Sequence, residues 1–294
     1  MTEERRPKGA RLPGERKRAG NIATGRSEEC LNDRGARSVT DDAVVRELAG
    51  ERRIVELEHR RQRVAGVVGA LWRGGSVVAL CAHRCELTTL PDSIASLHSL
   101  ERLDIGDNQL AALPALPAGL RELYIYDNRI ERLPPLPRLT VLDANRNRLT
   151  ELPPLADVAF VYAASNRLTR LPPLARVHYL NVGGNPLAGL EVVDPDLVEL
   201  RVEDAGLVAL PDSIGRLAGL RELSLRGNAI AVLPGSIGAL AKLRVLDLRG
   251  NRLDGLPETL RPLDLYKLDL RWNPMRGRPD WLPELAARGC LVYD

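Results

Sequence analysis

The sequence predicts an α/β repeat solenoid, an open stack of similar coils with a parallel sheet along one side. Three observations support this fold class. An eleven-residue pattern, apolar at positions 1, 4, 6 and 11, begins ten times at spacings of 19 to 23 residues. Hydrophobic residues make up 44% of the 294 residues but aromatic residues only 3%, so aliphatic side chains must fill the core. One copy cannot bury its own apolar edge, whereas ten stacked copies build a continuous interior.

The N-terminal part of the chain differs from the repeats. Residues 1–39 are polar and rich in Lys and Arg, and we expect a disordered basic tail. Residues 40–76 begin with Thr-Asp-Asp, which can cap a helix, so we expect a helical N-terminal cap that is interrupted near Gly50 or Gly66. Such a cap would cover the first coil, which an open solenoid otherwise exposes.

The ten repeats occupy residues 77–279, and a second cap follows them. Within residues 280–294 we expect a short helix that Gly289 stops, and then a last strand that closes the stack. The sequence pattern thus divides the chain into four segments: the tail (1–39), the N-terminal cap (40–76), the repeats (77–279) and the C-terminal cap (280–294).

Each position of the repeat has a physical role. The alternating apolar residues at positions 4 and 6 predict a short strand that points both side chains to one face. Position 9 is Asn in eight copies, where its amide can bond to the backbone of adjacent coils; Cys85 and Ala205 occupy it in the other two. Because Ala205 has no such group, it predicts a local weak point.

The segments that return the chain to the next strand are of two kinds. Most begin with Leu-Pro, and proline starts an extended segment because it fixes φ and lacks a donor. Units of 23 residues, such as the one containing LPDSIGRLAGL, leave room for a short helical turn. Units of 19 or 20 residues, such as the one containing LPPLADV, carry at least two prolines and exclude a regular helix.

From position 77 to position 275 the chain resembles leucine-rich-repeat proteins, on copies such as LERLDIGDNQL and LRVLDLRGNRL. The long units resemble Ras-suppressor-type repeats, and the short units, such as LPALPAGLRELYIYDN, are similar to repeats of bacterial effectors that are injected into host cells. The resemblance implies a right-handed horseshoe with a parallel concave sheet that binds another protein without catalysis. Some of these effectors carry a C-terminal ubiquitin-ligase domain, which we expect to be absent here.

Positions 3, 5 and 7 of each copy should face the concave surface. The only Phe and four of the six Tyr fall at these positions within four consecutive copies, and the other six copies have neither there. Rings suit strands in general, but this clustering favours a binding hot spot. The candidate partner-binding aromatic residues are Tyr124, Tyr126, Phe160, Tyr162 and Tyr179.

Charged residues lie beside the aromatic ones on the same surface. The candidates are the acidic Asp104 and Asp143, and Arg226, Arg249 and Arg271 at position 7 near the C-terminal end. Two interpretations stay open: acidic and basic side chains neutralise each other across strands, or they recognise a partner with a mixed-charge flank.

No catalytic or metal-binding pattern emerges. Cys81, His83 and Cys85 are close in sequence, but the repeat places the first two toward the concave surface and Cys85 in the coil, which opposes one tetrahedral metal site. The four His residues have no nucleophile at a useful spacing. We therefore predict no catalytic residues, no metal, no cofactor and no enzymatic activity.

The partner is expected to be a protein, bound by a monomer. The formal net charge is only +3, and acidic residues interrupt the basic tail and Arg60-Arg61-Gln62-Arg63, so a nucleic-acid adaptor is the less favoured alternative. A second alternative is that the chain is the substrate-recognition part of an effector or of a ubiquitin-ligase-like system.

The sequence contains no apolar run long enough to predict a membrane span. Four scattered Cys favour a reducing compartment, the cytoplasm of a bacterium or a host cell reached without a Sec signal.

Overall fold

The computed structural model describes residues 36–191 and 194–294. These residues lie in one compact unit that extends over positions 34–294. The predicted basic tail, residues 1–39, lies outside the described residues except for its last four positions.

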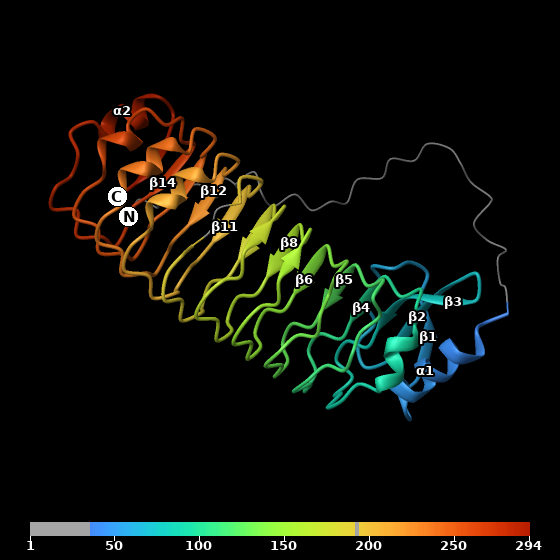
Figure 1. The fold of residues 1–294 in the computed structure, drawn as a ribbon. Coiled ribbons are helices and arrows are strands. Elements are labelled where there is room, and N and C mark those ends of the chain that lie inside the picture. Colours follow the sequence, from blue (N-terminus) through green and yellow to red (C-terminus); the bar gives the residue numbers. More distant parts are fainter. Residues whose placement is uncertain (1–35, 192–193) are drawn as a thin grey trace, which may run out of the picture. The chain divides into compact units, whose positions relative to one another are not determined.

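One sheet of 13 strands runs through the described residues. Within it, neighbouring repeat strands are parallel and follow each other in chain order, and equivalent repeat positions face each other, as Leu103 faces Leu123. Figure 1 shows these strands side by side. The predicted solenoid with a parallel sheet is confirmed. The ten repeat strands are β3 (Ser76–Cys81), β4 (Arg102–Asp104), β5 (Glu122–Tyr124), β6 (Val141–Asp143), β8 (Phe160–Tyr162), β10 (Tyr179–Asn181), β11 (Glu199–Arg201), β12 (Glu222–Ser224), β13 (Val245–Asp247) and β14 (Lys267–Asp269).

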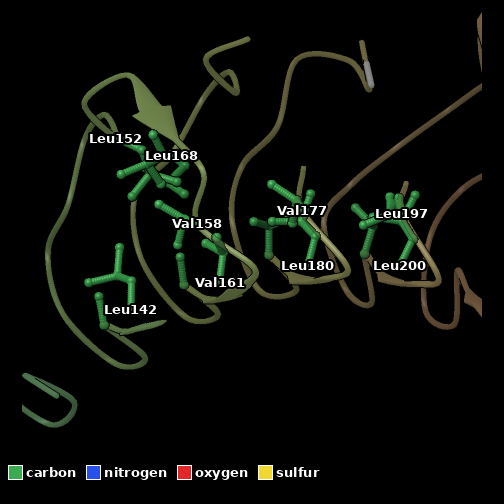
Figure 2. Packing of buried hydrophobic residues seen from close by; sticks show 14 of the residues in the cluster. Leu142, Leu152, Val158, Val161, Leu168, Val177, Leu180, Leu197 and Leu200 are labelled. Atoms are coloured by element: carbon green, nitrogen blue, oxygen red, sulfur yellow. The ribbon is translucent and has the colours of Figure 1, made fainter. Parts of the chain in front are cut away.

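The side chains at positions 1, 4 and 6 form one aliphatic core. In Figure 2, Leu142, Val161, Leu180 and Leu200 project from four neighbouring strands into the same interior. Each of the four is fully buried. Truncating such a leucine to alanine typically costs about 2 to 5 kcal/mol, so the repeated pattern alone supplies much of the stability. Positions 3, 5 and 7 consequently lie on the opposite side of the sheet, which we call the sheet face.

Asparagines at position 9 join the coils, as predicted. Asn128 Oδ1 accepts a hydrogen bond from Leu110 N at 3.0 Å, and its Nδ2 donates to Ile105 O at 3.0 Å, both in the preceding coil. All eight position-9 asparagines bond to the preceding coil in this way. Where Ala205 replaces Asn, the N–H of Leu187 in the preceding coil donates instead to Asn185 O in its own coil, at 2.8 Å.

The returns differ between long and short units, as predicted. The three units of 23 residues and the one of 22 residues each contain a 3₁₀ helix that begins directly after the proline of Leu-Pro: η1 (Asp92–Ser96), η2 (Asp212–Arg216), η3 (Gly235–Ala239) and η4 (Glu258–Leu260). Two short units instead pair their returns as β7 (Leu155–Ala156) and β9 (Leu174–Ala175).

The predicted helical cap over residues 40–76 is wrong beyond Gly50. Helix α1 (Val39–Ala49) is present, but β1 (Ile54–Glu56) and β2 (Val68–Arg73) follow it. Strand β2 forms an antiparallel hairpin with β3. The turn is Gly74-Gly75, with φ of +53° and +82°, a two-residue conformation that glycine adopts readily and that matches the twist of a hairpin. Residues 57–67, between β1 and β2, are called the cap loop below.

The C-terminal end agrees with its prediction. Helix α2 (Leu282–Ala287) is short, and Gly289 follows it with a φ of +94°, where a side chain would be strained. Strand β15 (Leu291–Tyr293) then pairs in parallel with β14. The last repeat therefore has a strand beside it, and β15 becomes the edge of the sheet.

Candidate functional site

Phe160, Tyr162 and Tyr179 are neighbours on the sheet face. They come from adjacent strands β8 and β10, whose register places Phe160 opposite Tyr179. The ring centroids of Tyr162 and Tyr179 are 4.6 Å apart, within the range of favourable aromatic pairs. The Phe160 side chain remains 43% exposed, so its ring is available for contact. We call these three residues the aromatic surface.

Tyr124 and Tyr126 lie on the same face but in a different environment. The guanidinium of Arg102 lies 3.9 Å from the ring centroid of Tyr124, and the Tyr124 hydroxyl donates to Glu122 at 3.2 Å. The hydroxyl of Tyr126 is 3.1 Å from Nδ1 of His83. Strand β6, which carries no ring, separates both from the aromatic surface. The structure therefore divides the five predicted aromatic residues into a pair with polar partners and a group of three, of which only Phe160 is exposed.

The cap loop contacts the sheet face at β4 and β5. Arg63 Nε donates to Asp104 Oδ2 at 2.6 Å, and its guanidinium lies 5.3 Å from the rings of both Tyr124 and Tyr126. Arg60 pairs with Glu122 at 3.3 Å. The side chain of Asp104 is only 1% exposed, so this predicted partner-binding carboxylate already has a cation from its own chain.

Sequence reasoning missed this role of Arg60 and Arg63, which it considered only as phosphate contacts. The carboxylates they meet lie far along the chain, as the 41-residue separation of Arg63 and Asp104 illustrates. No local pattern links the two. The sole available signal was the excess of positive charge in the cap loop opposite acidic residues of the second and third repeats.

Each of the three predicted arginines at position 7 pairs with a carboxylate of its own repeat or of the neighbouring repeat. Arg249 Nη2 bonds to Asp247 at 2.5 Å, and Arg271 Nη2 to Asp269 at 2.8 Å. Arg226 lies 3.3 Å from a carboxylate oxygen of Glu203. This geometry corresponds to mutual neutralisation, the first of the two interpretations of these charges.

The pKa of Asp269 reflects this pairing. Burial alone would raise it, but the hydrogen bond from Arg271 and the charges of Arg271, Arg249 and Lys267 hold the pKa below its usual value. The carboxylate is therefore stabilised in its charged form by its own neighbours.

Asp143 differs from Asp104, Asp247 and Asp269, which occupy the same position 5 in other repeats and each lie in an ion pair. No ion pair involves it among the described residues, and its side chain accepts one long hydrogen bond, from Asn145 N at 3.3 Å. Burial raises its pKa, and the hydrogen bond from Asn145 and the charge of Arg63 offset this only in part. It lies between Tyr124 and Tyr162 in the sheet register.

The tyrosines of the sheet face have raised pKa values. Burial raises the pKa of Tyr126 to about 12, with a further contribution from the charge of Asp104. Burial also raises the pKa values of Tyr124, Tyr162 and Tyr179. At neutral pH each ring therefore offers an apolar face and a hydroxyl, the combination common at protein interfaces.

The chemistry of the cysteines gives no sign of a reactive or metal-binding centre. Cys81, Cys85 and Cys290 are free and buried, and burial raises the pKa of Cys85 and of Cys290, which disfavours the nucleophilic thiolate. Within residues 36–191 and 194–294 no group of three His, Cys, Asp or Glu side chains is placed to hold a metal ion. Over the same part of the chain, no helix has the length and apolarity needed to cross a membrane.

Comparisons with known families agree on the repeats. Residues 195–253 and 218–275 match a model described as leucine rich repeat, and residues 119–157 match one described as two copies of leucine rich repeats. No curated protein sequence matches the chain.

Several solved structures are similar to it. YopM from Yersinia enterocolitica WA-314 is 34% identical, with a TM-score of 0.53, over 61% of this chain and 40% of YopM. A TDR receptor is 19% identical, with a TM-score of 0.56, over 86% of this chain and 44% of the receptor chain, which is a likeness of fold alone. InlJ from Listeria monocytogenes is 24% identical, with a TM-score of 0.45, over 54% of this chain and 40% of InlJ. The chain thus spans less than half the length of each.

Proposed function

Because the chain is a leucine-rich repeat protein, we propose that it is a non-catalytic scaffold that binds a protein partner on its sheet face. The observation that carries the proposal is the aromatic surface of Phe160, Tyr162 and Tyr179. Its rings lie on two adjacent strands, and Phe160 is 43% exposed. These rings are not needed to fill the core, which aliphatic residues occupy. Exposed, clustered rings of this kind commonly mark interaction sites.

The charged ends of the sheet face support a central position for the contact. Arg63 and Arg102 engage Asp104 and Tyr124 at one end, and Arg249 and Arg271 engage their own aspartates toward the other. A partner gains little there, because it would have to replace ion pairs that the chain already makes. The aromatic surface lies between these ends, where contact buries apolar area without breaking a pair.

The proposal includes the compartment. Cys81, Cys85 and Cys290 are free thiols, which suits a reducing compartment such as the cytoplasm. YopM, which is similar over 61% of this chain, is a Yersinia protein, and a bacterial origin is part of the same proposal. Arg60 and Arg63 contact carboxylates rather than lying free, so they favour the protein scaffold over a nucleic-acid adaptor.

The test compares a double variant with a matched control. Tyr162→Ala with Tyr179→Ala removes two rings of the aromatic surface, whereas Tyr266→Ala removes a ring that is 43% exposed at position 2, outside the sheet face. Affinity capture with wild type and with Tyr266→Ala identifies the candidate partner as a protein that both retain. With that partner purified, titration should show at least about 30-fold weaker binding to the double variant, the usual effect of removing a hot spot.

The fold must survive for this comparison to be valid. Both rings lie on the sheet face and not in the aliphatic core. The circular dichroism spectrum and the melting temperature of the double variant should therefore stay close to those of Tyr266→Ala. Equal partner binding by the double variant and the control would refute the proposed site.

A further inference from the structure

Position 5 of four consecutive repeat strands alternates between a carboxylate and a tyrosine. Asp104, Tyr124, Asp143 and Tyr162 lie on β4, β5, β6 and β8 and face each other directly in the parallel register. Neighbouring strands are about 4.8 Å apart, so each step of this row places an acidic group beside an aromatic ring. In two of these steps the carboxylate comes first along the chain, Asp104 before Tyr124 and Asp143 before Tyr162, and we compare these two.

The chain itself fills the first step with arginine. Arg63 bonds to Asp104 at 2.6 Å, and its guanidinium lies 5.3 Å from the rings of Tyr124 and Tyr126. Arg102 adds a second guanidinium 3.9 Å from the Tyr124 ring. A guanidinium suits such a step because its planar fork pairs with a carboxylate while its face stacks on an aromatic ring.

The second step has no cation among the described residues. Asp143 takes part in no ion pair there, and no guanidinium or ammonium group lies over the ring of Tyr162. The nearest arginines are used elsewhere: Arg63 is bonded to Asp104, and Arg146 is bonded to Asp127 at 2.5 Å through Nη2. A half-buried carboxylate without a cation is unfavourable, and an incoming cation would relieve that penalty.

Apolar side chains beside the second step suit the stem of an arginine. Val141 and Phe160 face each other at position 3 of the same strands, directly beside Asp143 and Tyr162, and Phe160 is 43% exposed. The three methylene groups of an arginine side chain can pack on such a surface while the guanidinium reaches a carboxylate. The lining therefore favours a long basic side chain over a free cation.

We propose that the partner inserts an arginine side chain into the step formed by Asp143 and Tyr162, repeating the contact that Arg63 makes with Asp104 and Tyr124. This inference rests on the proposed function, since it names the chemistry of the partner at the same surface. The partner segment carries arginine beside an apolar residue, which packs on Phe160 and Tyr179.

The test uses two short peptides and the full-length protein at neutral pH. Acetyl-Leu-Arg-Leu-amide is the probe, and acetyl-Leu-citrulline-Leu-amide is its neutral counterpart of nearly the same shape. Binding is followed by nuclear magnetic resonance on isotopically labelled protein. We expect saturable shifts at Tyr162 with the arginine peptide, and binding about tenfold weaker with the citrulline peptide, because the charge is lost.

The matched variants are Asp143→Asn and Asp196→Asn. Asp143→Asn keeps the shape of the side chain and should weaken binding of the arginine peptide about tenfold. Asp196 is exposed and precedes the seventh repeat, outside the sheet face, so Asp196→Asn should bind as wild type does. Equal affinity for the two peptides, or unchanged binding by Asp143→Asn, would overturn the inference.

Failure here is distinguishable from failure of the proposed function. If the arginine peptide does not bind but the partner still requires Tyr162 and Tyr179, the arginine inference is wrong and the scaffold proposal stands. If the partner ignores both tyrosines, the proposed site itself is wrong, and with it the inference that depends on it.

Discussion

Replacing Asn228 by alanine should destabilise the protein more than most single substitutions. Asn228 Oδ1 accepts hydrogen bonds from two backbone N–H groups of the preceding coil, Ala205 N at 3.1 Å and Leu207 N at 3.0 Å. Its Nδ2 donates to Val202 O of that coil at 2.7 Å. Side chains of all three backbone residues are buried, so water cannot replace the lost amide without opening the stack.

The magnitude follows from the orphaned groups. Each buried donor left without an acceptor costs about 1 to 3 kcal/mol, so two donors predict a loss of about 3 kcal/mol or more in the free energy of unfolding. The unpaired carbonyl of Val202 adds to this loss. A loss of this size is well above the change of about 0.5 kcal/mol expected at an exposed position.

Urea unfolding followed by far-ultraviolet circular dichroism measures this difference. The control is Gln109→Ala, which removes an exposed amide one residue after a position-9 asparagine. Unfolding of wild type and variants should be compared through both midpoint and slope, because a changed slope signals loss of cooperativity between coils. A decrease below about 1 kcal/mol for Asn228→Ala would refute the reasoning that the asparagines bind the coils together.

Two further predictions concern the asparagine hydrogen bonds between coils and the pKa of Tyr126. Ala205→Asn should raise the free energy of unfolding by about 1 kcal/mol, because it supplies the missing amide to the sixth coil; an unchanged or lower value in urea would contradict the predicted weak point. The pKa of Tyr126 is raised from 10.0 to about 12, so its contribution to stability is complete below pH 10 and is lost as the pH rises to about 12. Tyrosinate absorbance should show a step near pH 12 that Tyr126→Phe removes, and persistence of that step would assign it elsewhere.

Much of the fold was predictable because the repeat is a local pattern. The spacing of apolar residues identified which side chains enter the core, and the recurring Asn predicted the bonds between coils that Asn128 and its equivalents make. The cap was predicted less well. Residues 51–76 have helix-forming charged residues, but the hairpin of β2 and β3 adds strands to an existing sheet, and this tertiary pairing overrides local propensity.

The candidate site was predictable only in outline. Strand alternation placed Phe160, Tyr162 and Tyr179 on one face, and the structure brings the rings of Tyr162 and Tyr179 together. Strand alternation did not show that Asp104 is paired with Arg63, nor that Asp143 lacks an ion pair among the described residues. Both carboxylates occupy the same position of the repeat, so no argument from periodicity can separate them.

The sequence by itself determined the stack, the composition of its core and the face that carries the rings, because each depends on a pattern that repeats within about 20 residues. Only the tertiary structure decided which charges on that face are already neutralised. Arg63 and Asp104 are 41 positions apart in the chain, yet their side-chain atoms are 2.6 Å apart. The path of the cap loop brings them together, and Coulomb interactions depend on distance in space rather than along the chain.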